Sequence, residues 1–452
     1  MSIHPTSLGS PEFRAAYGVK SNYVMGGMVK GISSVTLVQK ATQAGYLAFY
    51  GAGGMRLEQI DAAIRELIAA LGPGKGWGVN FLHNALIPHQ EDALIELLLA
   101  RGIQVIEASA FVRITPALVR FRLSGLRLDP RGQVIPRQRI MAKVSHPEIA
   151  RRFMLPAPVE MVDTLRQQGY LTEVEASLSQ RIPLADDICA EADSGGHTDR
   201  RPAYALVPTF LRLRDRLAEH STYPVAVRIG TGGGIGSPEA VAAAFALGAD
   251  FVMTGSINQC TPEAGTSDAV KDLLAKADVQ DFDMAPAGDL FEIGAKIQVL
   301  KRGTLFAPRA NRLYDLYRHH QSLEEIPLNI RQELEQQVLG RSFDAVWQET
   351  RDYYQRTAPW ALEQLSAKQQ MAMIFRWYFI HSQRLAQQGL VEQSVNFQIH
   401  SGPAMASCNQ WLSGSDLERW PLRHVDILAD RLMAEAAQIL SRRLNAWSSS
   451  TA

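Results

Sequence analysis

The sequence is poor in the features that mark several large classes of protein. Only three cysteines occur, Cys189, Cys260 and Cys408, and they lie too far apart for a disulfide framework or a structural zinc site. Lys plus Arg and Asp plus Glu both number 46, so the basic surplus of a nucleic-acid or anionic-membrane binder is missing. No apolar run could span a bilayer, and the polar segment 1–12 is unlike a secretory signal. We therefore expect a soluble, cytoplasmic protein.

The chain does have ample material for a core. Hydrophobic residues make up 46% of its 452 residues, which is ordinary for a globular protein and too many for a disordered one. The length exceeds what one average domain needs. Two domains, or one large domain with an appendage, are therefore expected.

Short apolar segments alternate with helical patterns over roughly the first 300 residues. Most of these segments end in glycine or small polar residues, as strands that lead into a tight turn do. Eight strand–helix steps in about 255 residues are typical of a (β/α)8 barrel, with a doubly wound open sheet as the alternative. The eight predicted strands are Tyr23–Gly27, Leu47–Gly51, Trp77–Phe81, Gln104–Ala108, Arg139–Val144, Asp186–Glu191, Val225–Gly230 and Phe251–Gly255.

Two segments are inserted into this alternation of strands and helices. Residues 125–139 alternate apolar and polar side chains around Asp129-Pro130-Arg131-Gly132, which predicts a hairpin after the fourth strand. About 40 residues separate the fifth and sixth strands, enough for two short helices near 148–153 and 159–168. Both insertions leave the eightfold pattern intact.

The character of the chain changes near residue 310, where strand signals end and aromatic residues recur at helical spacing. Such a stripe is typical of a helical core, and a groove that faces a partner or substrate is the alternative. We predict a barrel over 1–309, a helical insertion over 310–395 and a C-terminal segment over 396–452. The amphipathic helix Val425–Leu440 in that last segment is expected to return to the barrel.

The densest motif is the glycine-rich run Gly230–Gly236, which follows the seventh strand and precedes a helix that begins at Ser237-Pro238. Backbone N–H groups of such a turn converge on an anion, and the helix N-terminus adds partial positive charge. The eighth strand ends in Gly255-Ser256. Loops after strands seven and eight form the common phosphate site of barrels, so we predict a phosphate here. The run is neither a Walker A loop nor a Rossmann fingerprint.

Three other strand ends carry glycines or polar groups. Gly26-Gly27-Met28 lets a flat ring approach the backbone, Asn80 offers an amide, and Lys143 offers a positive charge. Together with a phosphate, these groups suggest flavin mononucleotide (FMN). A turn-stabilising role for Asn80, and a solvated or ion-paired Lys143, are the alternatives.

The sharpest catalytic candidate is His197, within Glu191-Ala-Asp-Ser-Gly-Gly-His-Thr-Asp199 after the sixth strand. Two glycines before a histidine bring backbone close to a ligand, and imidazole can give a proton near neutral pH. A structural histidine is the alternative reading. His83, His89, His319 and His320 have no such setting, and no serine nucleophile elbow or metal-type pattern occurs.

With these residues in place, the sequence resembles the nitronate monooxygenase and flavin-dependent enoyl reductase superfamily. It is most similar to the PfaD-type branch, the trans-acting enoyl reductases of polyunsaturated fatty-acid and polyketide synthases. Thr198-Asp199 departs from simpler members, where a small residue follows the histidine. The motifs that carry the resemblance are Gly26-Gly27-Met28, Gly78-Val79-Asn80, Gly195-Gly196-His197, Gly233-Gly234-Ile235, Gly248–Ser256, Asp289-Leu-Phe-Glu-Ile-Gly294, Gln298–Phe306 and the helical tail.

The resemblance implies FMN, a nicotinamide reductant (NADPH or NADH), and an acyl-carrier-protein-bound 2-enoyl thioester as substrate. It places His197 as the active-site histidine. The cofactor-binding residues that it implies are Gly26, Gly27, Met28, Asn80, Gly233, Gly234, Gly255 and Ser256. We also expect Lys143 and Gly196 to contact the cofactor.

Three hypotheses follow for function. The first is the enoyl reductase, served by a synthase and its carrier protein, with a homodimer as a possible assembly. The second is a nitronate monooxygenase-type FMN oxygenase, and the third is a non-catalytic docking module of a megasynthase. A local basic patch that includes Arg309, Arg312 and Arg318 could meet an acidic carrier protein despite the zero net charge.

Overall fold

The computed structural model describes residues 2–74, 76–83, 88–219 and 226–449. The chain divides into two compact units. The first comprises residues 1–194, 199–265 and 404–452, and the second comprises 195–198 and 266–403. The second unit therefore begins well before residue 310, where the sequence analysis places the helical insertion, and it also takes in a four-residue segment from within the barrel sequence.

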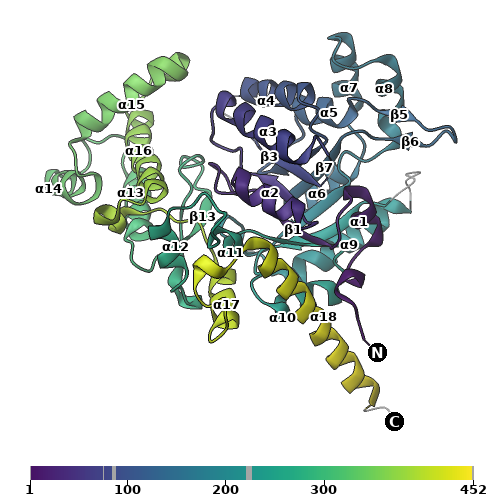
Figure 1. The fold of residues 1–452 in the computed structure, drawn as a ribbon. Helices are drawn as coiled ribbons and strands as arrows, with labels where there is room; N and C mark the ends of the chain where they lie inside the picture. The colour runs from purple at the N-terminus through teal and green to yellow at the C-terminus, as the bar shows by residue number, and fades with distance from the viewer. Residues whose placement is uncertain (1, 75, 84–87, 220–225, 450–452) are drawn as a thin grey trace. The chain divides into compact units, whose positions relative to one another are not determined.

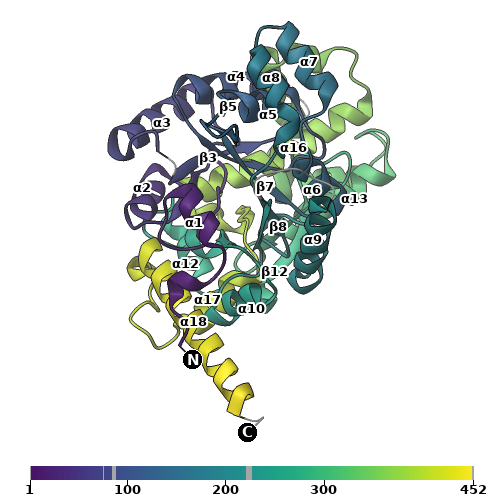
Figure 2. The same ribbon diagram turned by 90° about the vertical axis from the view of Figure 1, so that its right-hand side faces the viewer.

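The first unit is a closed barrel of eight parallel strands, in the order β1-β11-β10-β8-β7-β4-β3-β2. Helices surround the strands, as Figure 2 shows for α2, α3, α6 and α9. This confirms the predicted barrel over the open sheet, with each predicted strand present to within a few residues; Val225 lies outside the described residues. The strands are β1 (Tyr23–Met25), β2 (Leu47–Tyr50), β3 (Trp77–Leu82), β4 (Val105–Ser109), β7 (Arg139–Val144), β8 (Asp187–Glu191), β10 (Arg228–Gly232) and β11 (Val252–Thr254).

Helices and caps of this unit follow local sequence rules. In α1, Pro11 stands at the first position and the Ser10 side chain accepts from the Phe13 N–H, as N-capping requires. The predicted hairpin is present as β5 (Arg127–Leu128) and β6 (Val134–Ile135). The helices in the barrel part of this unit are α1 (Pro11–Tyr17), α2 (Val35–Gln43), α3 (Leu57–Leu71), α4 (Pro88–Ala100), α5 (Pro116–Leu123), α6 (Pro147–Met154), α7 (Val159–Gln167), α8 (Glu173–Leu178), α9 (Ala203–Ala218), α10 (Pro238–Ala246) and α11 (Ser256–Gln259).

The C-terminal part of this unit consists of α17 (Pro403–Leu412) and α18 (Val425–Ser449). Helix α18 packs against α10 and α2 of the barrel, and Figure 1 shows it beside α10. Its buried stripe includes Leu428, Leu432 and Met433. Among the described residues, no helix combines the length and apolar character needed to cross a membrane.

The second unit joins a small antiparallel sheet to a group of helices. Strand β13 (Lys296–Leu300) lies between β12 (Phe282–Pro286) and β9 (Gly196–His197). The helices, green in Figure 1, pack through a shared apolar core in which Phe375, Tyr378 and Phe379 are buried. They are α13 (Phe306–His319), α14 (Leu328–Glu333), the π-helical turn Leu334–Leu339, α15 (Phe343–Thr357) and α16 (Ala367–Gln388), and a further helix, α12 (Asp268–Leu274), contacts α16.

The core interpretation of the aromatic stripe is therefore confirmed for most of its members. Tyr353 and Trp360 are exceptions, with about half of their surface exposed. The sheet of this unit was not predicted, because its antiparallel strands lie outside the strand–helix alternation and adjoin a region with strong helical signals.

Candidate functional site

The carboxyl ends of the parallel strands lie at one end of the barrel, and several predicted residues follow or end those strands. Asn80 lies on β3 and Lys143 on β7, while Gly26 and Gly27 directly follow β1. The register pairs Asn80 with Glu107 of β4. This edge of a barrel is where active sites are built, so the strand ends form the candidate site.

Glu107 is the centre of a buried hydrogen-bond network that the sequence analysis missed. Its Oε2 accepts from the Gly27 backbone N–H at 2.9 Å and from the Asn80 Nδ2 at 2.8 Å. The same amide group of Asn80 also donates to the Ser109 hydroxyl at 3.0 Å. Glu107 and Asn80 are almost wholly buried. The backbone after β1 is therefore fixed to β3 and β4 by a carboxyl group and an amide.

Two acceptors of this network have no hydrogen-bond partner among the described residues. They are Glu107 Oε1 and Asn80 Oδ1, both buried. A buried polar atom without a partner costs roughly 1–3 kcal/mol, so such atoms call for an explanation. Two adjacent acceptors are satisfied by a ligand that brings N–H groups, or by a proton on the carboxyl group itself.

The charge balance near Glu107 is set by Lys143 and Glu191. Burial raises the pKa of Glu107, although the Lys143 ammonium and the two hydrogen bonds oppose this rise. The Lys143 Nζ lies 3.6 Å from Glu191 Oε1 at the end of β8. Burial works to lower the pKa of Lys143, but Glu191 and Glu107 outweigh it and raise that pKa. Lys143 is thus a fixed cation between two carboxyl groups, so it is ion-paired rather than solvated.

The glycines after β1 leave no room for side chains. A Cβ on Gly27 would lie 2.5 Å from Asn80 Cβ, and a Cβ on Gly26 would lie 2.9 Å from Met253 Sδ. The Met28 N–H donates to the Ser33 hydroxyl, which in turn donates to the Gly26 carbonyl at 2.9 Å. The Gly26–Met28 backbone is therefore held in one shape.

The glycine-rich turn follows β10 and leads into α10, as predicted. Gly233 has φ +90° and Gly234 has φ +72°, conformations that favour glycine. Around the Cβ position of Gly234 the described structure is open. Strand β10 pairs with β11, after which Gly255 and Ser256 begin α11. The turn and the start of α11 therefore follow neighbouring strands, the arrangement that the predicted phosphate site requires.

The remaining two predicted residues, Gly196 and His197, form β9 of the second unit. His197 pairs with Ile297 of β13, and its Nε2 lies 3.0 Å from Asp289 Oδ1. Gly196 has φ +80°, and a Cβ there would lie 3.5 Å from the Nδ1 of His400. The predicted cofactor contact of Gly196 and the catalytic role of His197 both stay predictions.

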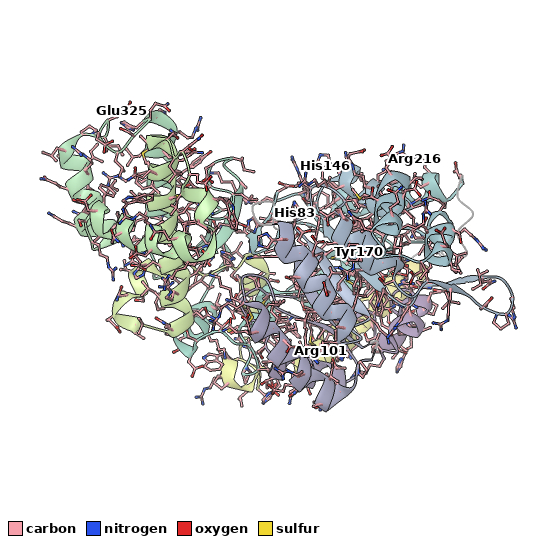
Figure 3. All side chains as sticks on the ribbon, turned by 90° about the horizontal axis from the view of Figure 1, so that it is seen from above. His83, Arg101, His146, Tyr170, Arg216 and Glu325 are labelled. Atoms are coloured by element: carbon pink, nitrogen blue, oxygen red, sulfur yellow. The ribbon has the colours of Figure 1, made fainter. Side chains whose placement is uncertain are left out.

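The other histidines discussed in the sequence analysis have local partners. His83, labelled in Figure 3, is buried and lies 2.7 Å from Glu91 Oε1. His319 and His320 lie within hydrogen-bond distance of backbone carbonyls one helical turn earlier. Among the described residues, no three metal-binding side chains gather into a group.

The basic patch is partly neutralised. Arg312 makes two contacts with the Glu333 carboxylate, at 2.6 and 2.7 Å, and Arg309 donates to Asn396. Arg312 can therefore pair with an acidic partner protein only after its ion pair with Glu333 breaks.

Three acidic residues that contact predicted site residues were not themselves predicted as site residues. Glu107 is one charged residue within an apolar strand, Glu191 ends a strand, and Asp289 lies in a motif whose role the sequence left unassigned. A carboxylate in the interior of a predicted parallel strand, where apolar residues are usual, was the one available signal for Glu107.

Comparison with known proteins identifies several relatives. Residues 320–397 match the family model of the inserted helical domain of [acyl-carrier-protein] S-malonyltransferase. The crystal structure of the enoyl reductase domain of MlnA, from the macrolactin biosynthesis cluster of Bacillus amyloliquefaciens, is 40% identical with a TM-score of 0.94. That match covers 98% of this chain and 99% of the MlnA domain.

Two longer proteins also match. The polyketide biosynthesis protein PksE of Bacillus subtilis is 46% identical over 98% of this chain. The polyketide biosynthesis protein ThaF of Burkholderia thailandensis is 44% identical over 96% of this chain. The chain spans 58% of the length of PksE and 37% of the length of ThaF.

A component of a fatty-acid synthase is similar as well. It belongs to the polyunsaturated fatty acid synthase of a Thraustochytrium species and is 40% identical over 91% of this chain. The chain spans 28% of the length of that component. Relatives in both polyketide and polyunsaturated fatty-acid synthesis therefore share this segment with the chain.

Proposed function

Because the chain belongs to the PfaD-type enoyl reductase family, which includes the enoyl reductase domain of MlnA, we propose that it is an FMN-dependent enoyl reductase. Its proposed substrates are 2-enoyl thioesters on an acyl carrier protein, reduced in trans at the 2,3-double bond with NADPH or NADH. The protein would carry out this reduction during polyketide or polyunsaturated fatty-acid biosynthesis. The observation that carries the proposal is the match to the MlnA domain over nearly the full length of both chains.

The barrel residues fit a flavin. The unpartnered acceptors Glu107 Oε1 and Asn80 Oδ1 suit a ring edge that carries N–H groups, and Lys143 supplies a positive charge for a reduced ring. The tight Gly26–Met28 backbone suits a flat ring. The turn at Gly233 and Gly234, with Gly255 and Ser256, would hold the phosphate.

The bound cofactor would supply the hydride, and the chain's own residues would place and polarise the substrate. His197 would donate a hydrogen bond to the thioester carbonyl oxygen, or a proton to the α-carbon. Glu107 and Asn80 would fix one edge of the ring, and the Lys143 ammonium would stabilise negative charge that develops there.

The proposal is tested with the purified protein, FMN, reduced nicotinamide and a carrier protein loaded with a 2-enoyl chain. Mass spectrometry of the carrier protein should show a gain of two hydrogen atoms. The variant His197→Ala should remain yellow and lose about 100-fold or more of this activity. The matched control, His319→Ala, should behave as the unaltered protein, because the His319 ring lies at the surface and within hydrogen-bond distance of the Asp315 carbonyl of its own helix.

Three results would overturn these assignments. Full turnover by His197→Ala would remove the role given to that residue. Oxygen consumption with alkyl nitronates, without any enoyl reduction, would make the protein the FMN oxygenase instead. A colourless protein after incubation with FMN would favour a docking module.

A further inference from the structure

The motif Asp289-Leu-Phe-Glu-Ile-Gly294 has no role in the function proposed above, although it contains the carboxylate nearest to His197. It forms the connection between β12 and β13, and His197 lies on β9, which pairs with the same strand β13. Asp289 Oδ1 and His197 Nε2 are 3.0 Å apart, within hydrogen-bond distance. The small sheet thus brings together two residues 92 positions apart in the sequence.

The connection that carries Asp289 is anchored on both sides. The Ala287 N–H donates to the Ala295 carbonyl at 2.8 Å, which closes the β12–β13 connection. Phe291 is fully buried and its ring packs against Tyr317 and Phe379 of the helices, with centroid distances of 5.1 and 5.5 Å. A carboxylate held by so fixed a connection can orient a neighbouring ring.

Asp289 carries the negative charge that a group orienting an imidazole ring needs. Burial works to raise the pKa of Asp289, but the hydrogen bond and charge of His197 outweigh it, so this pKa lies below its usual range. The group is therefore a carboxylate at neutral pH. His400, which bridges to Val299 of the same strand β13, adds a smaller effect in the same direction. Lys296, another β13 residue, lies over the Tyr314 ring at 5.3 Å.

We propose that Asp289 is a positioning residue for His197. It accepts the Nε2–H of the ring, fixes the ring orientation, and stabilises the protonated imidazole. Nδ1 is then the nitrogen that exchanges a proton with the substrate. When the proton passes to the α-carbon, the N–H bond at Nδ1 breaks and its electron pair stays on the ring, and water later restores the proton.

This inference rests on the proposed function, but one of its readouts does not. Titration of the His197 ring by NMR, assigned with His197→Ala, needs neither cofactor nor activity. In Asp289→Asn the acceptor oxygen remains and the charge is lost, so the ring should lose its proton at a pH lower by about one unit. A merely structural role for Asp289 would leave this titration unchanged.

Activity gives the second readout. Asp289→Ala should lower kcat roughly tenfold, a modest loss because a half-exposed pair is screened by water. Asp289→Glu should restore part of the rate. The basic limb of the pH profile should move to lower pH in Asp289→Asn. The matched control Glu292→Gln alters a carboxylate of the same connection, paired with Arg376 at 3.3 Å, and should leave both readouts unchanged.

The outcomes separate the two proposals. An unchanged His197 titration and pH profile in Asp289→Asn, with His197→Ala inactive, would overturn the positioning role and leave the enoyl reductase intact. A shifted titration in a protein without enoyl reduction would support the pairing and overturn the function.

Discussion

Two buried carboxyl groups at opposite ends of the barrel, Asp187 and Glu107, differ in how fully they are hydrogen-bonded. At the amino-terminal ends of the strands, Asp187 receives two hydrogen bonds from Arg228, at 2.6 and 2.7 Å, and one from the Tyr17 hydroxyl at 2.5 Å. At the carboxyl ends, Glu107 and Asn80 each keep one buried acceptor without a partner among the described residues. The Asp187 carboxylate therefore has its partners within the chain, whereas Glu107 and Asn80 each lack one.

We expect buried groups with all their hydrogen-bond partners to maintain the fold, and buried groups that lack a partner to bind a ligand. A buried ion pair whose hydrogen bonds are complete is costly to break, and it has no unpaired donor or acceptor with which to bind a ligand. Unpartnered acceptors beside glycines cost stability unless something else satisfies them. We therefore propose that Glu107 and Asn80 serve cofactor binding, whereas the Asp187–Arg228 pair serves stability.

The largest expected effect comes from the substitution Gly27→Val. Its side chain would collide with Asn80 and with Glu107, because a Cβ alone would lie 2.5 and 2.6 Å from them. Overpacking costs about 1–3 kcal/mol, so we expect flavin affinity to fall roughly 10- to 100-fold. Fluorescence titration of the apoprotein with FMN measures this affinity.

Gly74→Ala is the matched control, since no described atom lies within 4 Å of its Cβ position. It should bind FMN as the unaltered protein does. Equal affinity in the Gly27→Val protein would show that the ring does not lie against this backbone.

A smaller effect is expected for Glu107→Leu. The change removes the acceptor of the Gly27 N–H and the Asn80 amide, so flavin affinity should fall about tenfold, the consequence of one or two lost hydrogen bonds. The free energy of unfolding without flavin, measured in urea, should fall only slightly, because the loss of an unpartnered buried acceptor offsets part of the cost of the two donors that lose Glu107.

Glu107→Gln keeps the size of the side chain and an acceptor oxygen, so it should recover much of the affinity. A large loss of stability in Glu107→Leu, with unchanged flavin binding, would reverse the assignment of this end of the barrel.

The smallest effect is predicted for Tyr17→Phe at the opposite end. The loss of the hydroxyl removes one hydrogen bond to Asp187, so the free energy of unfolding should fall by about 1 kcal/mol. Flavin affinity and turnover should not change. A fall in flavin affinity with unchanged urea stability would remove the contrast between the ends.

Sequence reasoning predicted the barrel well because each strand is short, apolar and followed by a glycine or polar turn. Gly26, Asn80 and Lys143 could be placed at strand ends for the same reason. Glu107 could not be identified, since its partners come from strands 27 and 80 residues away along the chain. Only the closed barrel brings them together.

The second unit was harder to predict. Strands β12, β13 and β9 pair antiparallel and lie outside the strand–helix alternation that located the barrel strands, and β9 has only two residues, so the sequence pattern could not reveal them. The pairing of β9 with β13 is what brings His197 to Asp289. This contact depends on long-range strand register, which spacing within one segment does not encode.

The most direct test of the central claim is a single turnover without oxygen. The FMN-loaded protein is reduced, freed of nicotinamide, and mixed with a carrier protein that bears a 2-enoyl chain. We predict that the flavin absorbance returns in step with a gain of two hydrogen atoms on the carrier protein, and that a saturated acyl chain has no effect. A flavin that stays reduced in the presence of the enoyl chain would contradict the account.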